Sequence, residues 1–400
     1  MNDQTFSVCP LIKYSRRVIS LSKGLLSSRV LLFLTLITCC SPSAPLLAAS
    51  HFVDNAAPSG GNGSSWASAW NTFAAIDWGR VKPGDVVYIS GGNGSKVYTQ
   101  KIRVQMSGTA SARVLITRGT TSGHNGAVIL DGQMQIDHGI HIDSRDYITV
   151  SGLRIRNFYD RGQVYVRSTT GVIIQRNEIY VTSHGGVFLE QNTNAIVREN
   201  RITTPQNMTK QTDGIYSQHN TNNIYESNII IISNEAADEH IDGIQLFEDT
   251  GTTIRGNYVE QDTHKTENAQ GILLEASHGT LEVYNNTVYG PNTKNALLKL
   301  LNRRGGTARM LAHHNTLMGG GWGVLRVEDG PQSEVKNNIL VSDKEEAFIL
   351  RLEGALPSPA NIDANLYYLP HASDYGRIES QGYGWSAWRG QLNQRSKQTQ

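Results

Sequence analysis

The sequence has few cysteines, few prolines and few charged residues. Each of these shortages excludes particular kinds of site or structure. Its three cysteines, Cys9, Cys39 and Cys40, all stand within the first 40 residues. We therefore expect no disulfide, no catalytic thiolate and no cysteine-ligated zinc in the rest of the chain. The 11 prolines are too few for a collagen or a proline-rich linker. Charged residues make up only 18% of the sequence, which argues against long charged amphipathic helices.

The charge that is present is divided unevenly along the chain. Residues 1–49 carry a net charge of +4, so the remaining residues carry −3 within a total of +1. A protein whose main partner is a nucleic acid needs a strongly basic surface to neutralise phosphates. We therefore expect no nucleic-acid partner. The 39 glycines and many uncharged polar residues are typical of turns between short strands.

The first 49 residues have the pattern of a secretory signal. A basic and polar stretch is followed by an apolar run at residues 30–38, which is too short to span a bilayer. Small residues follow, with a cleavage pattern at Ala48-Ala49-Ser50. The pattern predicts a secreted or periplasmic protein with no transmembrane segment in the mature chain. A lipid-anchored form, attached through Cys39 or Cys40, stays open as an alternative.

The rest of the chain repeats a short phrase in which Asn precedes a variable residue and then an apolar residue. The repeated residues are Asn177, Asn200, Asn228, Asn257, Asn286, Asn315, Asn338 and Asn365, at intervals of 23 to 29 residues. A second phrase, Gly followed by an apolar alternation, recurs between them, at Gly139, Gly186, Gly214, Gly243, Gly271 and Gly323. A third short apolar run precedes the repeated Asn. Each repeat therefore holds three short strands separated by polar turns.

Three short strands in each repeat predict a three-sided solenoid. A propeller blade needs four strands and about 40 residues, and a leucine-rich repeat needs a ladder of leucines. Neither pattern is present. The remaining fold is all-β: a right-handed, single-stranded parallel β-helix with three sheets. We expect the repeated Asn to take the left-handed backbone conformation in a turn and to pair its amide with the next coil.

Both ends of such a solenoid need a cap over the core and the free strand edge. The predicted β-helix covers residues 50–376, and residues 51–92 form its N-terminal cap. Residues 377–400 are expected to form a C-terminal cap and a polar tail. Within the N-terminal cap, the spacing of apolar residues predicts a short helix over residues 64–76. These apolar residues are Trp66, Trp70, Phe73 and Ile76.

The chain resembles the pectate-lyase-like superfamily of right-handed β-helix proteins. The resemblance lies in the aromatic cap, in Pro83-Gly84-Asp85 followed by the strand at residues 86–89, and in the Asn-centred coils. It covers about residues 51–370, and its front end is most similar to the alginate-lyase and chondroitinase-like branch. It implies a carbohydrate-active protein. The same architecture serves lyases, hydrolases, epimerases and non-catalytic adhesins, and the Gly-His-Gly and Arg-Ile-Lys motifs of polygalacturonases are missing here.

Outward side chains of one sheet are expected to stack into columns, about 5 Å apart from coil to coil. One such column would make an elongated groove for a chain-like ligand. Its expected members are Phe188, Tyr216, Gln245, Leu273, Lys299, Arg326 and Arg351. The last three assume a shift of one residue relative to the earlier coils.

Residues 238–245 hold four ionisable groups at the start of one predicted strand. Asp213 and Asp242 stand 29 residues apart at matching phrases, so we expect them side by side on successive coils. Three roles stay open for this pair. The two carboxylates could bind Ca²⁺ together with Glu239, act as the acid and base of a glycosidase, or cap turns next to Gly. His240 could transfer protons.

These residues predict an enzyme that cleaves an acidic, uronate-containing polysaccharide by β-elimination. Lys299 or His240 would remove the C5 proton, and Tyr216 or His240 would protonate the leaving oxygen. The predicted catalytic residues are His240, Asp242, Asp213, Lys299 and Tyr216. The residues expected to bind the substrate are Gln245, Arg303, Arg326 and Trp322, with Arg326 neutralising the sugar carboxylate.

Two other functions stay open. A glycoside hydrolase would use Asp213 and Asp242 as acid and base, and an adhesin would bind a polysaccharide without cutting it. No organic cofactor is expected, because the sequence has no Gly-rich phosphate loop and no nucleotide fingerprint. Ca²⁺ is the one expected cofactor, and the protein is expected to be a monomer.

Overall fold

A computed structural model describes residues 48–205, 211–233, 240–263, 266–321, 323–345, 347–358, 361–371, 373–392 and 397–398. The predicted leader therefore lies almost wholly outside the described residues, and so do Glu239 and Trp322. Residues from Ala48 onward form one unit. Within the described residues, no helix has both the length and the apolar character needed to cross a membrane.

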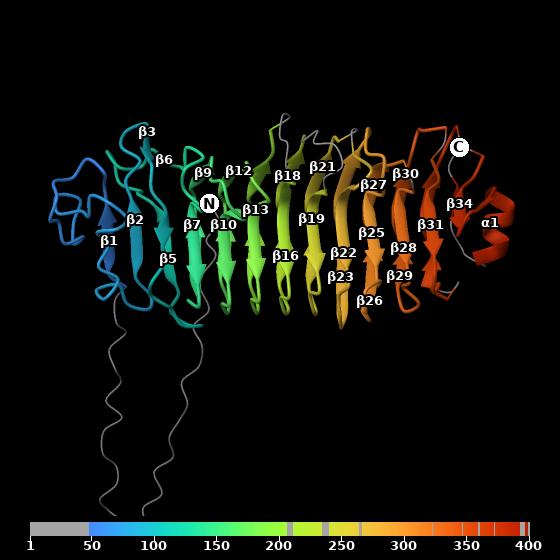
Figure 1. The fold of residues 1–400 in the computed structure, drawn as a ribbon, viewed down its shortest axis with the longest axis horizontal. Coiled ribbons are helices and arrows are strands. Elements are labelled where there is room, and N and C mark those ends of the chain that lie inside the picture. Colours follow the sequence, from blue (N-terminus) through green and yellow to red (C-terminus); the bar gives the residue numbers. More distant parts are fainter. Residues whose placement is uncertain are drawn as a thin grey trace, which may run out of the picture. The chain divides into compact units, whose positions relative to one another are not determined.

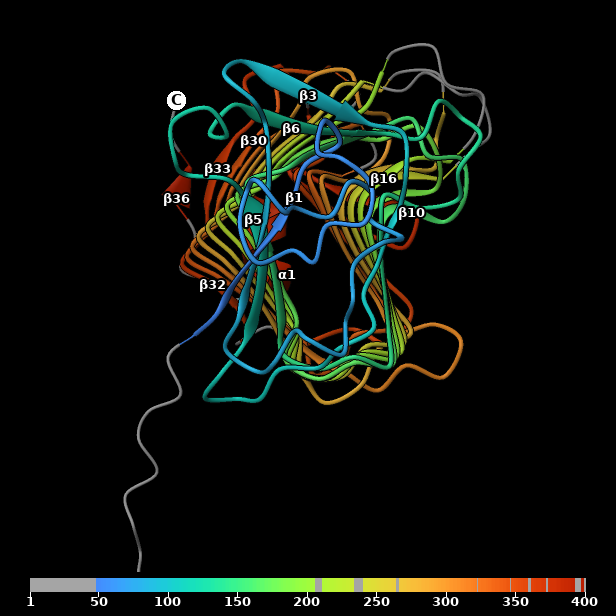
Figure 2. The same cartoon turned by 90° about the vertical axis from the view of Figure 1, so that its left-hand side faces the viewer.

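The chain winds into a right-handed parallel β-helix with three sheets of 12 strands each, so the predicted fold is confirmed (Figure 1). Successive coils lie in register behind one another when the solenoid is viewed from its end (Figure 2). Neighbouring strands pair in parallel, except for an antiparallel pair between β34 and β35 at the C-terminal end.

The bounds of the strands are as follows. Sheet A consists of β1 (Ser50–Val53), β2 (Val86–Ile89), β5 (Val114–Arg118), β8 (Ile148–Ser151), β11 (Ile173–Gln175), β14 (Ile196–Arg198), β17 (Ile224–Glu226), β20 (Thr253–Arg255), β23 (Thr280–Tyr284), β26 (Arg309–His313), β29 (Glu334–Lys336) and β32 (Ile362–Asp363). Sheet B consists of β3 (Ser95–Tyr98), β6 (Ala127–Asp131), β9 (Arg154–Arg156), β12 (Glu178–Tyr180), β15 (Arg201–Thr203), β18 (Ile229–Ile232), β21 (Tyr258–Gln261), β24 (Thr287–Gly290), β27 (Thr316–Gly319), β30 (Ile339–Val341), β33 (Leu366–Tyr368) and β36 (Lys397–Gln398). Sheet C consists of β4 (Ile102–Arg103), β7 (Ile140–Asp143), β10 (Gly162–Arg167), β13 (Gly185–Glu190), β16 (Asp213–Gln218), β19 (Ile241–Phe247), β22 (Ala269–Glu275), β25 (Leu298–Leu301), β28 (Leu325–Glu328), β31 (Leu350–Glu353), β34 (Gly376–Ile378) and β35 (Gln381–Tyr383).

The interior is filled by apolar side chains that stack from one coil to the next. In sheet C the inward column is Val164, Val187, Ile215, Ile244, Ile272, Leu298, Leu325 and Leu350, each with 0% exposure. Because side chains alternate along a strand, the residues between these point outward. The core therefore fixes which residues of sheet C face a ligand.

The repeated asparagines form a buried ladder, as predicted. Asn257 is typical: its Oδ1 accepts a hydrogen bond from the Asn228 backbone N–H at 2.9 Å, and its Nδ2 donates to Asn286 Oδ1 at 3.0 Å. The expectation that these asparagines are left-handed is wrong. The left-handed residue is the one before each of them, such as Ser227 with φ 55° and Asn285 with φ 54°. The ladder Asn uses its own backbone groups for bonds along the solenoid axis, so the preceding residue makes the turn.

The N-terminal cap contains turns where the sequence predicted a helix over residues 64–76. Trp70 is extended beside β1, because its N–H donates to the Phe52 carbonyl and its carbonyl accepts from the Asp54 N–H, both at 2.9 Å. The hydroxyl groups of Ser65 and Thr72 accept bonds from backbone N–H groups three residues later, which stabilises local turns instead of a helix.

The capping role itself remains with the expected apolar residues, since Trp70, Phe73 and Ile76 join the buried core. The described residues contain one α-helix, α1 (Trp385–Leu392), and it lies at the C-terminal end (Figure 1). Its Trp388 is fully buried and covers the last coil of the core.

Candidate functional site

The predicted outward column of sheet C is confirmed by the strand register. Tyr216 pairs with Phe188 on one side and with Gln245 on the other, and Leu273 pairs with Lys299, which confirms the assumed shift of one residue. The column then continues through Arg326, Arg351 and Arg377. We call the outer surface of β10 to β34 around this column the sheet C face.

Asp213 and Asp242 lie side by side at the start of β16 and β19, as their spacing predicted. The Asp242 backbone N–H donates to Asp213 Oδ1 at 2.7 Å, and the Gln270 backbone N–H donates to Asp242 Oδ1 at 2.7 Å. The Gln211 side chain donates to Asp213 Oδ2 at 2.8 Å. Both aspartates have 0% exposure, so they lie below the surface of the sheet C face.

Burial and proximity both disfavour the charged forms of these carboxyl groups. Burial raises the pKa of Asp213 well above its ordinary value, and the neighbouring Asp242 raises it further. Burial also raises the pKa of Asp242, although His240 partly opposes that shift. Two adjacent carboxyl groups whose pKa values are both raised lose their protons as a coupled pair, and not independently.

His240 connects this buried pair to the surface. Its side chain is 44% exposed, and its Nδ1 lies 3.6 Å from Asp242 Oδ2. That separation is too long for a good hydrogen bond but close enough for a strong electrostatic interaction. The interaction with Asp242 raises the pKa of the His240 imidazole by more than burial lowers it.

Tyr216 and two glutamines lie next to the aspartate pair and His240. Burial is the main cause that raises the pKa of the Tyr216 hydroxyl to about 12, and the charge of Asp213 is the next largest. This hydroxyl therefore keeps its proton. Gln245 Oε1, Gln270 Oε1 and Asp242 Oδ2 are buried oxygens that accept no hydrogen bond from the described residues. Buried acceptors normally have a donor, so this cluster suits a ligand that carries hydroxyl groups.

The predicted cations of the column are held by glutamates that the sequence analysis did not include. Glu328 lies 3.3 Å from the Lys299 ammonium and 3.2 Å from the Arg303 guanidinium. Arg326 contacts Glu328 at 2.5 Å and also pairs with Glu353. Although burial raises the pKa of Glu353, its arginine partners lower it below the ordinary value. Lys299 and Arg326 are therefore neutralised in part before any substrate binds.

These glutamates could have been found in the sequence. They stand two residues after the column cations in the repeated phrase Leu-Arg-x-Glu, at residues 325–328 and 350–353. Because residues two apart on a strand face the same side, the phrase places an acid beside each arginine.

The column also continues upstream of Phe188, beyond the range that the sequence analysis covered. The rings of His141 and Tyr165 lie 5.4 Å apart, those of Tyr165 and Phe188 5.7 Å, and those of Phe188 and Tyr216 4.8 Å. The same register rule that located Tyr216 would have found this aromatic row, which leads toward the aspartate pair.

The described residues alone do not fit a calcium site. No group of three or more His, Cys, Asp or Glu side chains arranged for a metal is present among them. Three of the four carboxylate oxygens of Asp213 and Asp242 already accept hydrogen bonds from amides. Glu239, the third predicted ligand, lies outside the described residues, so calcium binding stays a prediction and no step of the chemistry below depends on it.

The outer face of sheet B differs from the sheet C face. It carries most of the large apolar side chains that are exposed: Val97, Tyr180, Ile229, Tyr258, Tyr289, Met318, Ile339 and Tyr368. The buried ionisable groups of the aspartate pair and the stacked cations lie on sheet C instead. This difference identifies the sheet C face as the candidate active site.

The fold and this face define the protein as a right-handed parallel β-helix. A family model described as right handed beta helix region matches residues 87–231 and 138–317. The chain therefore belongs to this family. The resemblance to pectate-lyase-like β-helix proteins is confirmed as a resemblance of fold.

Similar solved structures agree with this fold. A structure of XylC with xylose is 10% identical, with a TM-score of 0.52, and the match covers 84% of this chain and 86% of that one. A GH136 lacto-N-biosidase from Eubacterium ramulus is 12% identical, with a TM-score of 0.46 and coverage of 88% and 68%. Pectate lyase Pel9A is 14% identical, with a TM-score of 0.44 and coverage of 79% of each chain. No curated protein sequence matches.

Proposed function

We propose that this protein is an exported enzyme that cleaves an acidic, uronate-containing polysaccharide of a cell wall or extracellular matrix by β-elimination. The observation that carries the proposal is the meeting of Asp213, Asp242, His240 and Tyr216 at one place on an elongated face. The sugar-bound structure of XylC, which shares the fold, gives further support for a carbohydrate ligand.

In the proposed reaction, the neutral imidazole of His240 accepts the C5 proton of the uronate. The electron pair of the C5–H bond forms a double bond between C4 and C5, and the bond between C4 and the glycosidic oxygen breaks. The Tyr216 hydroxyl gives its proton to the leaving oxygen, since its raised pKa keeps it protonated. Asp242 orients His240. Lys299, which lies two coils after Gln245 on the column, offers positive charge to the sugar carboxylate.

A glycoside hydrolase is the second candidate, and the raised pKa values of Asp213 and Asp242 favour it. A buried carboxyl group that keeps its proton near neutral pH is the usual general acid of glycoside hydrolysis. The full burial of both groups weighs against it, because at least one carboxyl group must reach the glycosidic oxygen.

A panel of acidic and neutral polysaccharides tests the proposal. Each reaction is followed by ultraviolet absorbance, which detects the unsaturated uronate, and by a reducing-end assay, with and without a chelator. We expect absorbance and reducing ends to appear together on an acidic polymer. Reducing ends without absorbance would instead establish the hydrolase, and binding without either product would establish an adhesin. Loss of activity in the chelator would show that calcium takes part.

A further inference from the structure

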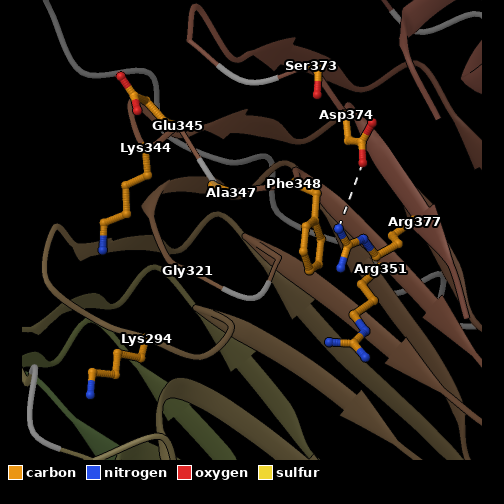
Figure 3. A pocket seen from close by; sticks show the side chains of 10 residues that line it. All are labelled: Lys294, Gly321, Lys344, Glu345, Ala347, Phe348, Arg351, Ser373, Asp374 and Arg377. Atoms are coloured by element: carbon orange, nitrogen blue, oxygen red, sulfur yellow. Dashed lines mark ion pairs between the residues drawn. The ribbon is translucent and has the colours of Figure 1, made fainter. Parts of the chain in front are cut away.

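The sheet C face ends in a hollow, several coils beyond the aspartate pair. This hollow has a volume of about 750 Å³. Arg351 and Arg377 form one wall beside the ring of Phe348, while Lys294 and Lys344 extend from the opposite side (Figure 3). We call it the arginine pocket.

The two arginines of the pocket are consecutive members of the outward column and are held in place by an aromatic ring. Their guanidinium carbons lie 5.7 Å and 4.4 Å from the centre of the Phe348 ring, for Arg351 and Arg377 respectively. Stacking on an aromatic face fixes the guanidinium plane and leaves its N–H edge available for hydrogen bonds. The Nε atoms of both arginines are buried and donate no hydrogen bond to a described residue.

Positive charge exceeds negative charge around the pocket, even when Glu353 is counted, which pairs with Arg351 from outside the lining. Of its two lining carboxylates, Asp374 lies 3.8 Å from Arg377, whereas Glu345 makes no ion pair within 4 Å with a described residue. Lys294 likewise has no ion pair among the described residues. Burial lowers the pKa of Lys344, although Asp343 opposes the shift, so the protein interior gives this ammonium little compensation. A negatively charged ligand would compensate it.

We infer that the arginine pocket binds an anionic group, a carboxylate or a sulfate ester, carried by a sugar residue of the polysaccharide. This inference rests on the proposed function, and it adds a distal binding subsite to the proposed active site. Arg351 lies four rungs from Gln245 along the paired strands, or roughly 19 Å at the spacing of β-strands. A chain must therefore be several sugars long to reach both places, so affinity rises at the length that first spans this distance.

Calorimetric titration with defined oligosaccharides tests the inference. The probes are oligogalacturonates, oligoalginates and chondroitin sulfate fragments of increasing length, with neutral xylo-oligosaccharides and inorganic sulfate as comparisons. We expect an R351Q/R377Q double variant to bind the longer anionic probes at least about tenfold more weakly than the wild type, because charge-assisted hydrogen bonds are lost. The K344Q variant, on the opposite wall, is also expected to weaken binding, and it leaves the ion pair between Arg351 and Glu353 in place.

The matched control is R309Q, which removes an arginine that is ion-paired with Glu334 on sheet A, away from the pocket. It is expected to bind all probes as the wild type does. Wild-type affinity in both pocket variants, or equal binding of inorganic sulfate and of the long probes, would overturn the inference. The ultraviolet assay on the same samples separates the two proposals: binding without product contradicts the lyase alone, and product with unweakened binding contradicts the pocket alone.

Discussion

At the scale of single residues, the proposed chemistry depends on His240 and on the carboxyl group beside it. His240 is half-exposed, whereas Asp242 has 0% exposure and contacts the imidazole from within the protein. This arrangement lets the histidine reach a ligand while a buried charge sets its pKa. The two residues therefore act together in the proposed reaction: His240 transfers the proton, and Asp242 positions His240.

The pH profile of kcat/KM should show this dependence directly. A general base works only when neutral, and Asp242 raises the pKa of His240, so we expect activity to increase with pH through a limb above about 6.5, the ordinary histidine value. D242N removes the interaction that raises the pKa of His240, so it should move this limb to lower pH. H240Q should reduce turnover by at least about a hundredfold.

The control for both variants is H219Q, which alters a histidine paired with Glu248 on the neighbouring turn. It should keep the rate and the profile of the wild type. An acid limb that stays in place in D242N would show that His240 is not the base.

A second residue-scale prediction concerns Asp249, which is fully buried in a ladder otherwise made of asparagines. Asn192 Oδ1 accepts from the Thr169 N–H, Asn220 Oδ1 from the Asn192 N–H, and Asp249 Oδ1 from the Asn220 N–H at 2.8 Å. Burial raises the pKa of Asp249 to about 6. Because the folded state then binds the proton more tightly than the unfolded state, stability falls as pH rises from about 4 to about 6 and stays lower above that range.

D249N should therefore stabilise the protein at neutral pH, by an amount on the order of 2 kcal/mol, and have little effect near pH 4. The amide keeps the Oδ1 acceptor and can donate to the nearby Ser217 and Thr252 hydroxyls. Denaturant unfolding at about pH 4 and about pH 7.5 measures the difference. An equal effect at both pH values would show that Asp249 is not the titrating group.

The sequence predicted some features of single residues and not others, for a physical reason. The contact between Asp213 and Asp242 could be predicted, because their spacing equals one coil and coils stack in register. Their full burial and the pairing of Lys299 with Glu328 depend on side-chain packing across the turns, which the repeat length does not specify. The Leu-Arg-x-Glu phrase does predict the pairs that lie within one strand, Arg326 with Glu328 and Arg351 with Glu353.

At the scale of elements, the asparagine ladder fixes how one coil follows another. Ladder residues such as Asn257 accept a hydrogen bond from a backbone N–H of the preceding coil and donate one to a side-chain oxygen of the next, all within the buried interior. Hydrogen bonds of this kind set the register that brings the columns of sheet C into line. The prediction of an N-terminal helix was wrong, because the backbone groups of Trp70 form hydrogen bonds with β1. The helical spacing of apolar residues does not reveal that these backbone groups have partners outside a helix.

N257A should destabilise the β-helix by about 3 kcal/mol, because it leaves the Asn228 N–H and the Tyr225 carbonyl without partners inside the core. The control is N125A, at an exposed asparagine near the N-terminal end, which should change stability by less than about 0.5 kcal/mol. Urea unfolding of both variants measures the contrast. Similar stability in the two would mean that the ladder asparagines do not hold the coils together.

At the scale of the whole described unit, the solenoid separates two kinds of surface. The outer face of sheet B carries most of the exposed large apolar side chains, together with charged residues such as Arg154 and Glu178. The sheet C face runs from an aromatic row through the aspartate pair to the arginine pocket. A single repeating backbone thus presents one long face with polar and charged groups at fixed intervals. We expect a chain-like anionic ligand to lie along that face.

A crystal structure of H240Q with a long acidic oligosaccharide tests this claim most directly. The variant keeps the sheet C face but lacks the proposed base, so the substrate should remain uncut. We predict that the sugar chain follows the column from Tyr216 to Arg377, with one anionic group between Arg351 and Arg377. A chain bound instead over Tyr258 and Tyr289 on sheet B would contradict the account.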